Sequence, residues 1–102
     1  MVQLGRMRPS EALAVHRDEL GELVRRYDVR PPRVFGSVLT GTDTEDSDLD
    51  LLVDPRDSTT LMTIAGLRID AEKLLGVSVD VLTPDGLPPK FRDKVLRQAE
   101  PV

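Results

Sequence analysis

The sequence predicts a single α/β domain in which helices cover one sheet, in the order αβαβαβα. Three observations support this prediction. Segments with the helical spacing of apolar residues alternate with short apolar runs typical of strands. A chain of 102 residues suits one domain with a modest core. The polar loop around Asp46 is too short to link two domains, so we expect one domain over residues 1–102.

Four helical segments are expected, one of them a single turn. They span residues 10–27, 38–40, 60–75 and a last stretch that begins at Pro88 or Pro89. Ser10 is the expected N-cap of the first helix, and Gly76 lies where the C-cap of the third belongs. The last helix carries a basic face that we expect to be solvated: Lys90, Arg92, Lys94 and Arg97.

Three short strands and a possible edge strand lie between these helices. They are residues 33–35, 49–53 and 77–82, with the edge strand in residues 99–102. In the third strand, valines alternate with Ser78, Asp80 and Leu82, so Asp80 lies on the opposite face from the valines.

Three carboxylates in the second and third strands are the first candidates for function. Asp48 and Asp50 share one face of a strand that is otherwise apolar, and Asp80 lies in the middle of the next strand. Charged side chains are rarely buried unless they are paired or bound. If the two strands are neighbours, the three carboxylates converge and cannot all stay ionised without a cation. Oxygen ligands without Cys or His suit Mg²⁺ or Mn²⁺.

Gly36 and Ser37 follow the first strand and form a candidate phosphate site. Glycine lets phosphate oxygens approach the backbone closely, and the Ser37 hydroxyl and neighbouring N–H groups can donate hydrogen bonds to them. A phosphate site beside a metal site predicts binding of a nucleoside triphosphate.

This arrangement resembles the nucleotidyltransferase fold of the DNA polymerase β superfamily. The superfamily pattern is matched by Phe35-Gly36-Ser37, a gap of ten residues, Asp48-Leu49-Asp50 and Val79-Asp80-Val81. The resemblance implies a mixed sheet, two Mg²⁺ ions on Asp48, Asp50 and Asp80, and β- and γ-phosphates on Gly36 and Ser37. It also implies that Asp80 takes, or helps to take, the proton of the attacking hydroxyl.

The small size is similar to that of the minimal nucleotidyltransferases, or MNT proteins, of prokaryotic HEPN/MNT toxin–antitoxin pairs. Members of that family are cytoplasmic antitoxins that transfer AMP from ATP to a tyrosine of a HEPN toxin. This chain departs from the usual motif at Thr40, where many relatives carry an arginine that could neutralise phosphate charge. Arg33 and Arg56 are alternative phosphate contacts that the sequence leaves open.

Two other functions stay open at this point. One is an antitoxin that neutralises its partner by binding, with weak or no transfer. The other is a nucleotidyltransferase subunit that acts on a small molecule such as an antibiotic. The protein encoded by the neighbouring reading frame would distinguish the small-molecule transferase from both kinds of antitoxin.

Several other functions are disfavoured. The net charge of −4 and the scarcity of aromatic residues disfavour a nucleic acid as the main partner. The first residues hold no signal-peptide pattern, and no apolar run is long enough to span a membrane. An EF-hand beginning at Asp46 is excluded because its sixth position is Leu51 and not glycine. We expect no ligand role for His16 or for the carboxylates of the loop and turn: Asp43, Glu45, Asp46, Asp54 and Asp57.

Overall fold

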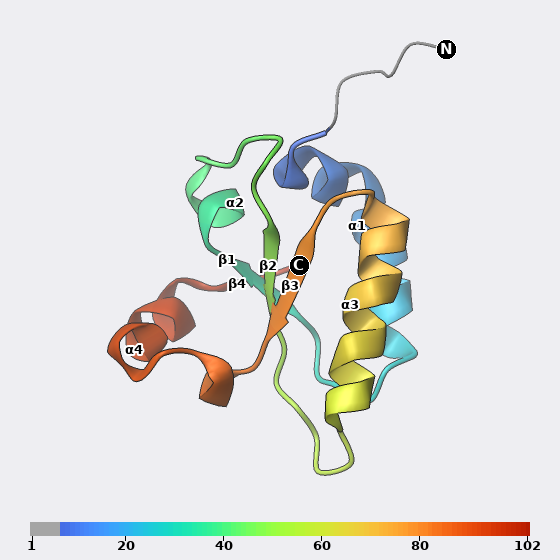
Figure 1. The fold of residues 1–102 in the computed structure, drawn as a ribbon, viewed down its shortest axis with the longest axis vertical. Coiled ribbons are helices and arrows are strands. Elements are labelled where there is room, and N and C mark those ends of the chain that lie inside the picture. Colours follow the sequence, from blue (N-terminus) through green and yellow to red (C-terminus); the bar gives the residue numbers. More distant parts are fainter. Residues whose placement is uncertain (1–6) are drawn as a thin grey trace.

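The computed structural model describes residues 7–102 and has the expected alternation of helices and strands (Figure 1). Residues 1–6, in which the sequence predicts no signal peptide, lie outside the described residues. In chain order the elements are α1 (Pro9–Arg25), β1 (Arg33–Phe35), α2 (Ser37–Thr40), β2 (Leu49–Leu52), α3 (Leu61–Leu75), β3 (Val79–Leu82), the 3-10 turn η1 (Pro84–Gly86), α4 (Pro89–Gln98) and β4 (Glu100–Pro101). Within residues 7–102, no helix has the length and hydrophobicity needed to cross a membrane.

The four strands form one mixed sheet in the order β3-β2-β1-β4. Strand β2 pairs in parallel with β3, whereas β1 pairs antiparallel with both β2 and β4. The condition behind the carboxylate prediction, that the second and third strands are neighbours, is therefore confirmed. The expected edge strand is also present, as β4.

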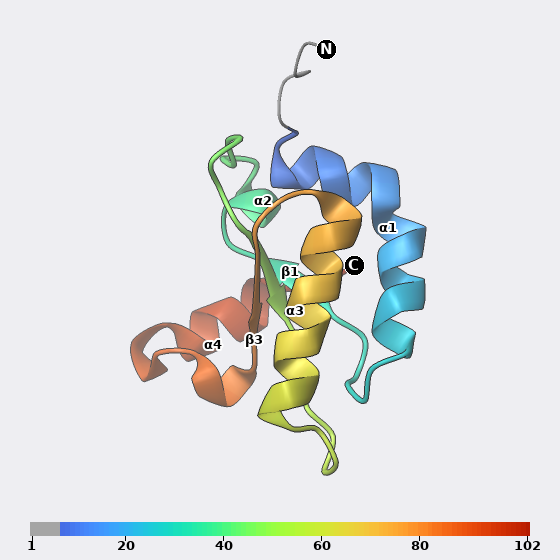
Figure 2. The same cartoon turned by 45° about the vertical axis from the view of Figure 1, so that its right-hand side comes forward.

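The two faces of the sheet differ in cover and in polarity. One face is apolar and packs on α1 and α3, which lie together on that side of the sheet (Figures 1 and 2). The other face packs through Phe35 and Leu52 on Leu87, which precedes α4, and on Val95 and Leu96 of α4. Because side chains alternate along a strand, Asp50 shares this second face with Leu52, and Asp80 shares it with Leu82. Asp50 is half-buried and Asp80 is exposed, so α4 leaves this end of the face open to solvent.

The expected cap at Ser10 is wrong. Helix α1 begins one residue earlier, at Pro9, which suits the first helical position because it has no N–H to satisfy. The residue before it is Arg8, whose backbone N–H donates to Glu11 Oε1 at 2.9 Å. Further along, α1 bends at His16 (φ −113°, ψ 21°), whose ring Nδ1 lies 2.8 Å from Glu19 Oε1.

The ends of α3 agree with the sequence. The Thr60 hydroxyl accepts a hydrogen bond from the Thr63 N–H at 3.2 Å, and Gly76 ends the helix with a φ of +70°. Helix α3 thus leads directly into β3 and fixes where the strand that carries Asp80 starts. Two expected strands are shorter than predicted, since β2 stops at Leu52 and β3 begins at Val79.

Candidate functional site

Asp50 and Asp80 form the centre of the candidate site. The parallel register of β2 and β3 places them directly opposite one another on the open end of the sheet face. Burial, together with the charges of Asp80 and Asp48, raises the pKa of Asp50 from 3.8 to about 6. At neutral pH the pair therefore holds mutually repelling charge, which a bound cation would relieve.

Asp48 lies immediately before β2 and is exposed. Its charge acts on Asp50, as the pKa of that carboxyl shows. Within residues 7–102, however, no three or more acidic or histidine side chains are gathered closely enough to form a ready-made metal site. The structure thus brings Asp50 and Asp80 together and keeps Asp48 within electrostatic reach. The three-carboxylate metal site stays a prediction.

Gly36 lies against the carboxylate of Asp50. Its backbone has a φ of +77°, a region that only glycine adopts easily. A Cβ at this position would lie 2.3 Å from Asp50 Oδ2, which is too close for any side chain. The reason is the antiparallel register, because Phe35, which precedes the glycine, lies opposite Asp50. The structure therefore joins the Gly-Ser segment to the acidic pair, although ten residues separate them in the sequence.

The segment after Gly36 is one tight helical turn. The N–H groups of Leu39 and Thr40 donate to the Gly36 carbonyl at 3.1 and 3.2 Å. Ser37, the first residue of α2, is half-buried beside this turn. It directly follows the glycine that lies against Asp50, so the sequence's prediction that its hydroxyl binds phosphate stays a prediction.

Thr40 contributes no charge to this turn. Its Oγ1 lies 3.4 Å from the Gly36 carbonyl oxygen, 3.3 Å from the Ser37 carbonyl oxygen and 2.9 Å from Thr42 Oγ1. The side chain is thus engaged with its own loop. It also lines a pocket of about 230 Å³ between α2 and α4 whose other lining residues are Phe35, Gly36, Leu39, Phe91, Lys94, Val95 and Gln98.

Asp43, which the sequence places in a solvated loop, is buried and only 5% exposed. Its Oδ2 accepts a hydrogen bond from the Ser10 N–H of α1 at 2.9 Å, and no partner of its Oδ1 is found among the described residues. Burial pushes its pKa upward, but the hydrogen bonds from Ser10 and the nearby charge of Arg8 outweigh burial and bring the pKa below its ordinary value. Asp43 thus fastens the loop that leads into Asp48 to the start of α1. No local pattern in the sequence could show this contact, because its two residues are 33 positions apart.

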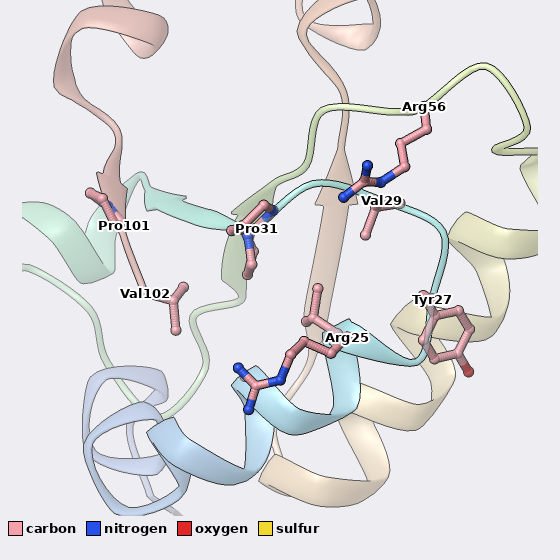
Figure 3. Close-up of a pocket in the computed structure, with 10 residues that line it drawn as sticks. Arg25, Tyr27, Val29, Pro31, Arg56, Pro101 and Val102 are labelled. Atoms are coloured by element: carbon pink, nitrogen blue, oxygen red, sulfur yellow. The ribbon is translucent and has the colours of Figure 1, made fainter.

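Arg33 and Arg56 lie away from Gly36. Arg33 pairs in the sheet with Leu52, at the opposite end of β1 from the glycine, and its Nη2 lies 3.0 Å from Asp54 Oδ2. Arg56 follows β2, and its Nε lies 3.8 Å from Asp28 Oδ1. Figure 3 shows it beside a different pocket, of about 330 Å³, that Arg25 also lines. Both arginines therefore have carboxylate partners at a distance from the candidate site.

The sequence is similar to those of known proteins. The profile of a family described as nucleotidyltransferase domain matches residues 13–100. The chain is similar to the protein adenylyltransferase MntA of Thermococcus cleftensis, with 38% identity over 86 residues that cover 84% of each chain. It is also 31% identical over 77 residues to a candidate protein adenylyltransferase of Methanocaldococcus jannaschii, covering 76% of this chain and 83% of that protein.

Solved structures give the same result. The structure of a candidate minimal nucleotidyltransferase matches with a TM-score of 0.83 and 43% identity, covering 96% of this chain and all of that one. A toxin–antitoxin structure with AMP-PNP matches with a TM-score of 0.67 over 91% of this chain and 71% of that one. At 19% identity this second likeness shows the fold alone. The α/β fold expected from the sequence is confirmed.

Proposed function

Because the chain belongs to the nucleotidyltransferase domain family, as its sequence motifs indicated, we propose that it is a protein adenylyltransferase antitoxin. It would transfer AMP from ATP to a hydroxyl group of a HEPN-type toxin partner, in the cytoplasm, where ATP is available. The observation that carries the proposal is the Asp50–Asp80 pair on the open sheet face, with Gly36 packed against the Asp50 carboxylate. The relatives named as protein adenylyltransferases support a protein acceptor. Residues 1–102 would act as one minimal nucleotidyltransferase domain.

The candidate ligands suit the metal that this chemistry needs by their oxygen donors, although among residues 7–102 they are not gathered into a ready-made site. The candidate ligands are Asp48, Asp50 and Asp80, and carboxylate oxygens are the donors that Mg²⁺ and Mn²⁺ prefer. Burial first, and then the charges of Asp80 and Asp48, raise the pKa of Asp50, and a divalent cation would offset this negative charge. When bound, the metal would neutralise charge on the triphosphate and on the oxygens that enter and leave.

The protein's own groups would bind ATP and manage one proton. The Ser37 hydroxyl and the backbone after Gly36 would hold the β- and γ-phosphates in place. Asp80, the more exposed carboxylate of the pair, would accept the proton of the acceptor hydroxyl. The hydroxyl oxygen then bonds to the α-phosphorus, and the bond to the bridging oxygen breaks. Pyrophosphate leaves, so the remaining work is positioning and charge neutralisation.

The direct test is to incubate the protein with its HEPN partner, ATP and Mg²⁺ and to weigh the partner by mass spectrometry. We expect the partner to gain the mass of AMP, and to gain nothing when ATP or Mg²⁺ is left out. The variant Asp48→Asn, Asp50→Asn should transfer nothing. The matched control Asp57→Asn, Asp85→Asn removes the same charge from two exposed sites and should transfer normally. An unmodified partner with the natural chain would overturn the proposal.

Thr40 favours a second candidate function, a stoichiometric antitoxin with little transfer. The position at which many relatives place an arginine is uncharged here, and its hydroxyl is bound to its own loop. If the chain acts only by binding, the natural chain and the Asp48→Asn, Asp50→Asn variant should protect the target of the toxin partner equally well. Loss of protection in that variant alone would favour the enzyme.

A further inference from the structure

We propose that Lys94, on α4, supplies the positive charge for the β- and γ-phosphates that Thr40 lacks. The inference rests on the proposed function, because it assumes that a nucleoside triphosphate binds beside Gly36. The fact that carries it is a shared pocket: Lys94, Thr40 and Gly36 all line the hollow between α2 and α4. Residues 54 positions apart in the chain are thereby brought to the same place on the surface.

Lys94 is the one charged side chain among the lining residues of this pocket. It is exposed, and no carboxylate partner for it is found among residues 7–102. By contrast, Arg33 and Arg56, the two phosphate contacts that the sequence leaves open, are paired with Asp54 and Asp28. A lysine without a partner, on a flexible four-carbon stem, is available for an incoming anion.

The other cations of α4 are engaged elsewhere or lie outside the pocket. Arg92 Nε donates to the Pro84 carbonyl at 2.9 Å and its Nη2 to the Leu87 carbonyl at 3.2 Å, so it holds the helix to the preceding turn. The Lys90 ammonium lies 5.8 Å from the centre of the Phe91 ring. Arg97 does not line the pocket. Of the basic face expected to be solvated, Arg92 is half-buried and the other three residues are exposed.

The chemistry of the pocket favours an anion held at its rim. The lining beside Lys94 is largely apolar, with Phe35, Leu39 and Val95, which weakens screening of a nearby charge. A triphosphate on the Gly36–Ser37 backbone would present its terminal phosphates to whatever cation borders that backbone. An arginine at position 40 would approach from α2, and Lys94 approaches the same pocket from α4.

The test compares nucleotide affinities by calorimetry with Mg²⁺ present. Lys94→Met should weaken ATP binding roughly three- to tenfold, between the effects of an exposed ion pair and of a charge-assisted hydrogen bond. AMP binding should not change, because AMP lacks the phosphates that Lys94 would contact. Lys94→Arg keeps the charge and should retain ATP affinity. Lys90→Met is the matched control one turn earlier on the same helix and should bind both nucleotides normally.

A rescue experiment separates a phosphate contact from a structural effect. Thr40→Arg should restore ATP affinity in the Lys94→Met protein, and should improve it less in the natural protein, because both cations would neutralise the same phosphates. Equal ATP affinity of Lys94→Met and the natural chain would overturn the inference, as would an equal loss for ATP and AMP. Failure of the natural chain to bind ATP at all would instead overturn the proposed function.

Discussion

Among single residues, Gly36 and Asp50 constrain each other most closely. The glycine has no alternative, because its φ of +77° disfavours a side chain and the Asp50 carboxylate occupies the space where a Cβ would lie. The aspartate, in turn, is half-buried opposite another carboxylate, which is unfavourable unless a ligand binds. The carboxylate of Asp50 therefore weakens the empty fold at neutral pH, and Gly36 is the residue that leaves room for it.

Asp50 gives a stability prediction with a defined pH dependence. Its folded-state pKa of about 6 lies above 3.8, so its contribution to stability is complete below pH 3.8 and is lost as the pH rises through 6. In metal-free buffer at pH 7.5, Asp50→Asn should therefore stabilise the fold by on the order of 1 kcal/mol, after a discount for partial exposure to solvent. Thermal unfolding should show the gain shrinking toward pH 4, and the exposed control Asp57→Asn should show none. Unfolding of Asp50→Asn would mean that the carboxylate is structural.

For Asp43 we expect the opposite pH dependence of fold stability. Its pKa is lowered in the folded state, so the ionised carboxylate stabilises the fold above pH 3.8, and this contribution is lost as the pH falls through the folded-state pKa. Asp43→Ala leaves the Ser10 N–H without its partner and should cost about 1–2 kcal/mol in urea unfolding at pH 7. Asp43→Asn keeps an oxygen acceptor and should lose less. Equal stability of all three proteins would show that the loop needs no such tether.

Among the three long helices, α4 is the one held most weakly. None of its residues is buried, and it packs on the smaller of the two apolar clusters. Helices α1 and α3 instead cover the larger cluster on the other face of the sheet (Figure 2). We therefore expect α4 to open before the rest of the fold.

Arg92 allows this expectation to be tested. Arg92→Met removes the hydrogen bonds to the carbonyls of Pro84 and Leu87. This should lower the free energy of local opening of α4 by about 1 kcal/mol, which raises the opening equilibrium constant roughly fivefold. Hydrogen exchange should become faster in residues 89–98 by about this factor and stay unchanged in β2. Arg97→Met, on the same helix, should change neither region. Uniform acceleration across the chain would instead place α4 in the global folding unit.

For the molecule as a whole, ATP and the metal should stabilise the fold together. A ligand at a hundred times its Kd adds about 2.7 kcal/mol, or roughly 10–20 °C in Tm for a chain of this length. We expect a shift of this order with ATP and Mg²⁺ combined, and much smaller shifts with either alone, since the cation and the triphosphate complete each other's site. The Asp48→Asn, Asp50→Asn variant should lose the shift. A full shift with ATP alone would argue against a metal role for the carboxylates.

The sequence by itself determined the order of the elements and the candidate site residues. Helix and strand spacing is a local property, so periodicity was sufficient to identify α1, α3 and the three main strands. The Gly-Ser and Asp-x-Asp segments are short motifs whose residue types already imply phosphate and metal chemistry. One error is also local: a serine is normally the better cap, but Pro9 and Glu11 place the helix start one residue earlier, with Arg8 before it.

Only the tertiary structure decided which of these residues meet. The facing of Asp50 and Asp80 depends on the pairing of β2 with β3, and the contact of Gly36 with Asp50 depends on the antiparallel register of β1. Asp43 and Lys94 gained their roles from neighbours far away in the chain, Ser10 and Thr40. Such contacts depend on how the helices pack on the sheet, and local patterns of residue types do not predict that packing.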